Sequence, residues 1–130
     1  MEQKQSIKHD KMQVYVYENI KDIIMGLSKS DIDKNDIKIL KIELEKPVFK
    51  TCYNSKTIVG YIDVFVQFEI KDSFVQIAIE LKPKIYSLGE LIRQVKTYET
   101  YCYKYIYAVL CYEDNYKNVI ESQNIRFMKL

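Results

Sequence analysis

The sequence predicts an α/β fold, a central mixed sheet flanked by helices, with the element order α-β-β-β-α-β-α-β. Two kinds of apolar spacing support this prediction, because some segments repeat every three or four residues and others every second residue. Only 3 Gly and 2 Pro occur among 130 residues, which leaves little room for long linkers. We therefore expect residues 1–130 to form one domain, a length typical of a single core.

Two segments have the features of long helices. In residues 9–27, apolar side chains recur on one helical face, and the polar stretch of residues 28–36 predicts a loop after it. Ser87 and Glu90 form an S-x-x-E pattern, which marks the beginning of a second helix because the two residues can cap its first turn. A shorter helix is expected at residues 116–122.

Five segments have the features of strands. Pro47 follows the first and interrupts it, which suggests an edge or a bend, and Asp72 with Ser73 suits a tight turn between the second and third. Residues 105–112 are apolar without alternation, as in a strand buried on both faces. The expected strands cover residues 37–45, 58–70, 74–82, 105–112 and 125–130.

The composition argues against several classes of protein. A net charge of +2 gives no overall basic character, and no stretch approaches the roughly 20 apolar residues that span a membrane. A secretory signal is not recognisable, so we expect a cytoplasmic protein without a membrane partner. The three cysteines lack C-x-x-C spacing, so they are interpreted as small buried hydrophobes rather than disulfide or zinc ligands.

Three charged residues interrupt the apolar second and third strands. Asp63 is expected on the face opposite Ile62 and Val64, whereas Glu80 and Lys82 are two residues apart and share a face. A hairpin of these strands would bring Asp63 close to the other two. Buried charges are costly unless they are paired or bind a metal, and two carboxylates are the usual beginning of a Mg²⁺ or Mn²⁺ site. Such a site suits phosphodiester hydrolysis.

Asp63 together with Glu80-Leu81-Lys82 resembles the catalytic signature of the PD-(D/E)XK nucleases. The resemblance covers roughly residues 12–112 and implies a restriction-endonuclease-like core. It further implies that Asp63 and Glu80 hold the metal, that Leu81 adds its backbone carbonyl, and that Lys82 assists the attacking water. The proline that often precedes the aspartate in this family is absent here.

The predicted helix after the third strand contains a further motif. Gln94 and Tyr98 are one helical turn apart and resemble the Q-x-x-x-Y motif of the RecB-like branch. The resemblance implies that Gln94 supports the metal site and that Tyr98 lies near the DNA backbone. Arg93, Lys84 and Lys96 lie close by in the sequence and are candidates for phosphate contacts.

The resemblance also implies an acidic residue on the first helix. Glu18 matches the family pattern and is the candidate, although helical spacing puts it nearly opposite the apolar stripe. Asp22, closer to the flank of the stripe, is the alternative. His9, the only histidine, is interpreted as a structural or surface residue.

These observations together predict a Mg²⁺-dependent deoxyribonuclease that hydrolyses phosphodiester bonds, with Mg²⁺ or Mn²⁺ as cofactor and DNA as partner. A non-catalytic DNA-binding or protein-interaction module on the same fold is the main alternative. A structural domain that associates through its tyrosine-rich surface is a third reading. A homodimer is compatible with all three.

Overall fold

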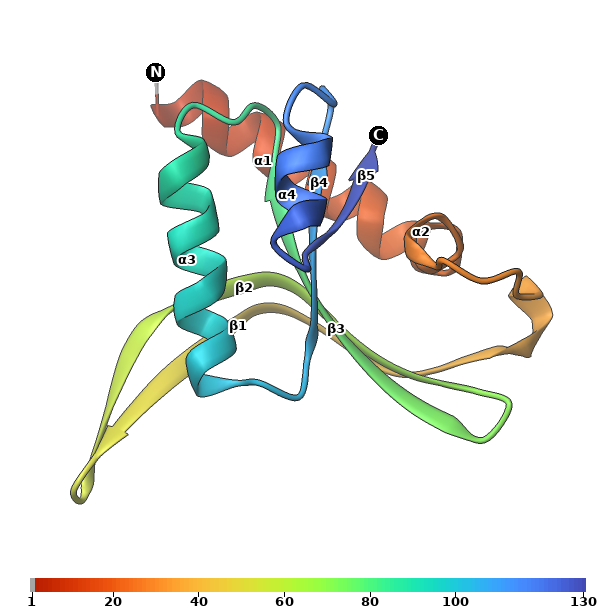
Figure 1. Cartoon of the computed structure of the whole chain (residues 1–130), viewed down its shortest axis with the longest axis horizontal. Coiled ribbons are helices and arrows are strands. Elements are labelled where there is room, and N and C mark those ends of the chain that lie inside the picture. Colours follow the sequence, from red (N-terminus) through yellow and green to blue (C-terminus); the bar gives the residue numbers. More distant parts are fainter. Residues whose placement is uncertain (1) are drawn as a thin grey trace.

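A computed structural model describes residues 2–130, with side chains from Ile7 onward. It contains one mixed five-stranded sheet, in the order β1-β2-β3-β4-β5, with helices on both faces (Figure 1). The predicted fold class is confirmed, and the element order is consistent with a restriction-endonuclease-like core. The elements are α1 (Glu2–Glu18), α2 (Ile20–Leu27), the 3-10 turn η1 (Lys34–Asp36), β1 (Ile37–Cys52), β2 (Ser55–Ile70), β3 (Ser73–Lys82), α3 (Leu88–Tyr101), β4 (Ile106–Cys111), α4 (Lys117–Ser122) and β5 (Arg126–Lys129).

The sheet has an antiparallel half and a parallel half. β1, β2 and β3 form an antiparallel meander, whereas α3 and α4 are crossovers that place β4 parallel to β3 and β5 parallel to β4. In the parallel half, Glu80 lies opposite Val109 and Lys82 opposite Cys111. The end of β3 that carries these two charged residues is therefore held against a strand whose last five residues are all buried.

Two hydrophobic clusters sandwich the sheet. The first packs α1 and α2 against one face and contains all six members of the predicted helical stripe. The second packs α3 and α4 against the other face and includes Val95, Ile120 and Phe65. The stripe residues, each at most 7% exposed, are Met12, Val16, Ile20, Ile23, Ile24 and Leu27.

The first predicted helix consists of two helices instead of one. α1 begins at Glu2, earlier than residue 9, and the helical run is interrupted at Asn19, whose φ of −117° and ψ of 30° are not helical. The Asn19 side chain donates a hydrogen bond to the Tyr15 carbonyl at 2.8 Å, a local bond that competes with helix continuation. Among residues 2–130, no helix combines the length and apolarity needed to cross a membrane.

β1 and β2 extend further than predicted. β1 continues through Pro47, which pairs with Tyr61, and ends only at Cys52, while β2 begins three residues earlier than expected, at Ser55. The expected interruption at Pro47 is wrong, whereas the edge that Pro47 suggested is confirmed. β1 is the edge strand, where the missing N–H of proline costs no hydrogen bond to a second neighbour.

Two smaller expectations also need correction. The turn between β2 and β3 consists of Lys71 and Asp72, both with positive φ, so Ser73 already belongs to β3. Of the cysteines, Cys111 is buried as expected, but Cys52 is exposed at the end of β1.

Candidate active site

β2 and β3 separate at the position of Asp63. Their paired register runs as far as Val64 and Ile79 and stops there. One residue further on, Oδ2 of Asp63 accepts a hydrogen bond from the backbone N–H of Leu81 at 2.8 Å. The carboxylate therefore satisfies a backbone donor that faces the widening gap between the two strands.

The side-chain alternation of β2 also breaks at this point. Ile62 and Phe65 both pack in the cluster beneath α3 and α4, whereas Val64 packs in the cluster beneath α1 and α2. The expectation that Ile62 and Val64 share a face is therefore wrong. The ladder is irregular here because β2 leaves β3, and because Glu45 in the neighbouring β1 has a left-handed φ of 52°.

Glu80 is the most unusual side chain of the site. It is 2% exposed, and its Oε1 has no hydrogen-bond partner among the described residues. Burial raises the pKa of Glu80 well above 4.5, the negative charge and hydrogen bond of Asp63 raise this pKa further, and Lys82 opposes the shift. Two adjacent buried carboxyl groups share a proton unless a cation lies between them and allows both to be ionised.

α1 brings two further polar side chains to Asp63. His9 Nε2 lies 3.1 Å from Oδ1 of Asp63, and the Gln13 amide donates to the backbone carbonyl of Asp63 at 2.8 Å. The same amide donates to Oε1 of Glu45 at 3.1 Å. His9 and Gln13 are four residues apart and so lie on one face of α1.

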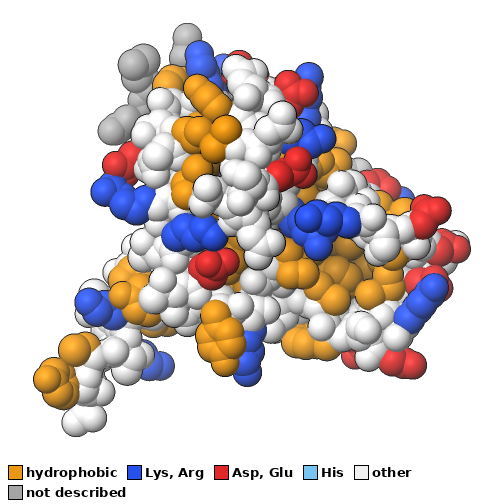
Figure 2. Space-filling view, viewed as in Figure 1, with side chains coloured by type: hydrophobic (Ala, Val, Ile, Leu, Met, Phe, Trp, Pro, Cys, Tyr) orange, Lys and Arg blue, Asp and Glu red, His pale blue; other side chains and the backbone are white. Residues whose placement is uncertain are grey.

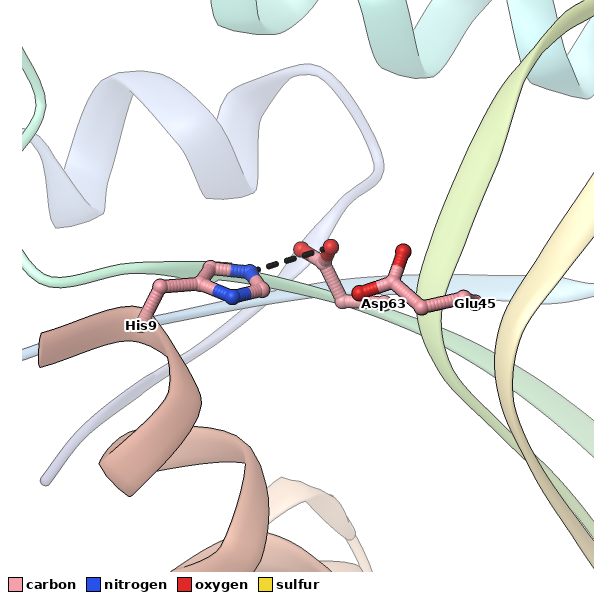
Figure 3. Close-up of side chains that lie close together, drawn as sticks. All are labelled: His9, Glu45 and Asp63. Atoms are coloured by element: carbon pink, nitrogen blue, oxygen red, sulfur yellow. Dashed lines mark ion pairs between the residues drawn. The ribbon is translucent and has the colours of Figure 1, made fainter. Parts of the chain in front are cut away.

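His9, Glu45 and Asp63 form a group that could hold a metal ion. One donor atom from each lies within 4.8 Å of the others. Figure 3 shows the three side chains converging from α1, β1 and β2, with His9 directed at the Asp63 carboxylate. The hydrogen bond to Asp63 raises the pKa of His9 above 6.5, burial opposes this shift, and nearby carboxylates support it. The imidazole therefore retains its proton more strongly than a free histidine.

A cleft of about 500 Å³ lies between α3 and the strands, and neither Asp63 nor Glu80 is among the residues that line it. Three residues predicted for the site, Lys82, Gln94 and Tyr98, line it, and so do the predicted phosphate contacts Lys84 and Arg93. The helix that forms one wall begins where predicted, because the Ser87 hydroxyl accepts a hydrogen bond from the backbone N–H of Glu90 at 3.3 Å.

Gln94 and Tyr98 are joined to β2 by hydrogen bonds. The Gln94 amide donates to the Tyr98 hydroxyl at 3.0 Å, and that hydroxyl donates to the Tyr61 carbonyl at 3.4 Å. Tyr98 is only 3% exposed, and burial raises the pKa of its hydroxyl, so the group stays protonated at neutral pH. The Q-x-x-x-Y pair thus fixes α3 against the strand that carries Asp63.

Three predicted site residues lie away from this arrangement. Glu18 is exposed, and nine residues separate it from His9, which is about two and a half helical turns and places the two on opposite sides of α1. Its alternative, Asp22, pairs with Lys34 at 2.8 Å on the surface. Lys96 donates to the Gln123 carbonyl at 2.7 Å and thereby connects α3 to the segment after α4.

Sequence reasoning missed His9, Gln13 and Glu45. His9 and Gln13 share a helical face with an i, i+4 spacing, which was a usable signal, but nothing in the sequence says which strand that face meets. Glu45 gave no signal, because its orientation depends on a left-handed backbone conformation in the middle of a strand.

No family model and no curated protein matches the chain. Among solved structures, the chain is similar to EndoMS in its apo form, with a TM-score of 0.46 and 16% sequence identity. The similarity covers 91% of this chain and 45% of that one, so the chain spans less than half the length of EndoMS. At this level of similarity, nothing about activity follows from the likeness.

Proposed function

We propose that this chain is a divalent-metal-dependent deoxyribonuclease, and the orphaned carboxylate oxygen of Glu80 is the observation that carries the proposal. A buried polar atom without a partner costs roughly 1–3 kcal/mol, and more when it is charged. Native proteins contain few such atoms, and a bound ion is one way in which the missing partner is supplied. Glu80 contacts Asp63, and Lys82, two residues further along β3, lines the cleft, so a cation would find two carboxylate ligands close to the cleft wall.

The oxygen-rich donor set favours a hard divalent cation. Asp63 and Glu80 would hold Mg²⁺ or Mn²⁺ through carboxylate oxygens. Leu81 is suited to add its carbonyl, because the N–H and C=O of one strand residue point to the same neighbour and its N–H already faces Asp63. His9 and Glu45 are the additional donors on the other side of Asp63.

A divalent cation bound here would polarise the scissile phosphate and lower the pKa of an attacking water. Lys82 would neutralise charge that develops on the phosphate, since it lies two residues beyond Glu80 and lines the cleft. Gln94 and Tyr98 would act by holding α3 and β2 together. Lys84 and Arg93 would bind neighbouring phosphates, although Arg93 also pairs with Glu90. Glu18 stays a prediction without a contact to this site.

A cleavage assay tests the proposal. The parent, Glu80→Gln and the matched surface variant Glu121→Gln would be incubated with single-stranded, duplex and flap DNA, and with RNA of the same sequence. Each substrate is tested with Mg²⁺, Mn²⁺ or EDTA. We expect metal-dependent cutting of DNA by the parent and by Glu121→Gln, and a loss of at least about 100-fold in Glu80→Gln, as for removal of a principal group that stabilises the transition state.

Two results would refute the proposal. Cutting that persists in EDTA, or equally in Glu80→Gln, would show that these carboxylates do not carry the reaction. A folded parent that binds DNA but cuts none of the substrates with either metal would instead identify a non-catalytic DNA-binding module.

A further inference from the structure

β1 and β2 continue beyond the body of the protein as a two-stranded arm, defined here as residues 49–59. Figure 1 shows this arm projecting from the sheet, with its yellow tip at the lower left. Every residue of the arm is exposed, and none belongs to either hydrophobic cluster. An isolated two-stranded hairpin is marginally stable in water, so such an extension contributes little to folding and requires another explanation.

The charge of the arm and its flanks has one sign only. Residues 46–62 contain three lysines and neither aspartate nor glutamate. Lys50 and Lys56 form no ion pair with any described side chain, whereas Lys46 at the base pairs with Glu43. The face drawn in Figure 2 agrees, because the extension at the lower left shows hydrophobic and basic side chains without acidic ones. This charge complements a polyanion.

The tip of the arm presents an aromatic ring to solvent. Tyr53 is 97% exposed and has a left-handed φ of 54°, a conformation that favours glycine and costs a bulky residue roughly 1–2 kcal/mol. Phe49 is 42% exposed, with the Lys56 ammonium 5.6 Å from its ring centroid. Tyr53 thus gains little from folding in this position, as expected for a side chain that contacts another molecule.

The two free lysines lie on opposite faces of the arm. Lys50 pairs with Thr57 across the strands and Lys56 pairs with Thr51, and neighbouring cross-strand pairs point to alternate faces. A two-stranded ribbon fits the major groove of B-form DNA, which is about 12 Å wide. A ribbon with one lysine on each face can approach the phosphates on both walls of such a groove.

The base of the arm joins the candidate active site. Val59 lines the same cleft as Lys82 and Lys84. Lys56 precedes Asp63 by seven residues on the continuous strand β2, a separation of about 23 Å at the usual strand rise. A duplex held by the arm would therefore meet the carboxylates about two-thirds of a helical turn away, given a turn of about 34 Å.

We propose that the β1–β2 arm is a duplex-DNA-binding element that enters the major groove and holds its phosphates through Lys50 and Lys56. This inference rests on the proposed nuclease function and specifies its substrate as double-stranded on one side of the cut. A second copy of the chain is the competing occupant. Two such arms would bring lysines together without any acidic residue to pair with them, which disfavours that association.

The test is a binding titration in EDTA, where no cutting is expected, on a labelled duplex of about three helical turns. Lys50→Ala/Lys56→Ala is compared with the parent and with Lys29→Ala/Lys71→Ala, which removes two exposed lysines from the loop after α2 and the β2–β3 turn. Both double variants lower the formal net charge from +2 to 0. Because the arm lysines are exposed, thermal unfolding should be unchanged.

For the arm variant, we expect the slope of log affinity against log salt to fall by about 2, one for each lysine that no longer reaches a phosphate. Its affinity should drop about tenfold or more at moderate salt, and single-stranded DNA should be much less affected. In Mn²⁺, KM for duplex cleavage should rise while kcat is retained. The Lys29→Ala/Lys71→Ala control should keep the salt slope of the parent.

Several outcomes would overturn this inference. If both double variants bind duplex like the parent, the arm does not touch DNA, while cutting by the parent would leave the nuclease proposal intact. An equal loss on single strands would exclude the groove. If light scattering shows that the parent is a dimer and the arm variant is a monomer, the arm binds a second copy of the chain instead of DNA. A parent that neither binds nor cuts DNA would refute both proposals, whereas binding without cutting, abolished in the arm variant, would support the arm alone.

Discussion

The Tyr98 hydroxyl lies where a side chain at position 60 would be, because a methyl group added to Gly60 would come within 2.0 Å of it. The ring carbon that carries the hydroxyl would be only 2.7 Å away. Gly60 therefore permits the close approach of α3 to β2 that the Tyr98–Tyr61 hydrogen bond requires.

We predict that Gly60→Ala displaces Tyr98 and lowers the free energy of unfolding by about 1–3 kcal/mol, as overpacking of a filled site does. Gly89→Ala is the matched control, because nothing lies within 4 Å of its added methyl group and it stands in a helix. That control should be neutral or stabilising by roughly 0.5–1 kcal/mol. Urea unfolding measures both. Equal stability of Gly60→Ala and the parent would show that Tyr98 does not need this approach.

In the absence of metal, we predict that Glu80 makes the protein less stable as the pH rises, the opposite of the usual effect of a carboxyl group. Its folded-state pKa is raised above 4.5, mainly by burial and then by Asp63, so the folded state holds a proton that the unfolded state releases. This contribution to stability is complete below 4.5 and is lost as the pH rises through the folded-state pKa.

In EDTA at pH 8, Glu80→Gln should therefore be more stable than the parent. Its free energy of unfolding should be higher by an amount on the order of 1–3 kcal/mol, and its melting temperature should be higher as well. Addition of Mg²⁺ or Mn²⁺ should raise the melting temperature of the parent and leave that of Glu80→Gln unchanged. Glu121→Gln, on the surface of α4, is the comparison and should respond to metal as the parent does. A variant that is less stable than the parent across the pH range would mean that Oε1 of Glu80 has a partner in the folded protein.

We predict that His9 makes the site bind Mn²⁺ in preference to Mg²⁺. Mn²⁺ accepts imidazole more readily than Mg²⁺ does, so a site that includes His9 should favour Mn²⁺. The hydrogen bond to Asp63 raises the pKa of His9 above 6.5, and this proton must leave before the nitrogen can bind a metal. Mn²⁺ affinity should therefore increase as the pH rises above 6.5.

In His9→Ala, we expect Mn²⁺ affinity to fall about 10- to 100-fold and its dependence on pH to weaken, while Mg²⁺ affinity changes less. Calorimetric titration at several pH values measures both. Gln13→Ala serves as the control, since it removes a neighbour of Asp63 that is not a metal donor. A Mn²⁺ affinity that is equal in His9→Ala and the parent would confine the metal to the Asp63–Glu80 side.

The sequence was sufficient for the class of the fold and for the charged residues of β2 and β3. Asp63 and Glu80 were identifiable because each interrupts an apolar strand, where a charge is costly unless something pairs with it. Pro47 correctly suggested an edge, but the end of the strand was misplaced because the sequence does not distinguish an edge strand that continues from one that ends. The face on which Ile62 lies was also predicted wrongly. Side chains alternate between the two faces of a sheet only where the strand is regularly paired with its neighbours, and the pairing of β2 with β3 ends at Val64.

The contact between His9 and Asp63 could not be predicted, for a different reason. A single histidine on an amphipathic helix is equally compatible with solvent, core and metal, and only the packing of α1 against β2 decides among these. Glu18 was favoured by a family pattern, yet a helix that presents His9 and Gln13 to the sheet turns Glu18 to its other side. Whether α1 presents His9 or Glu18 to the sheet depends on the rotation of the helix about its own axis, which the residue pattern of the helix does not determine.

The separation of the arm from both hydrophobic clusters also has an evolutionary consequence. Residues 49–59 can lengthen, shorten or exchange side chains without opening a cavity in the core, because no core residue depends on them. The carboxylates, by contrast, are fixed between two packed layers. Selection can therefore change what the protein recognises and what it does to its substrate along largely separate mutational paths.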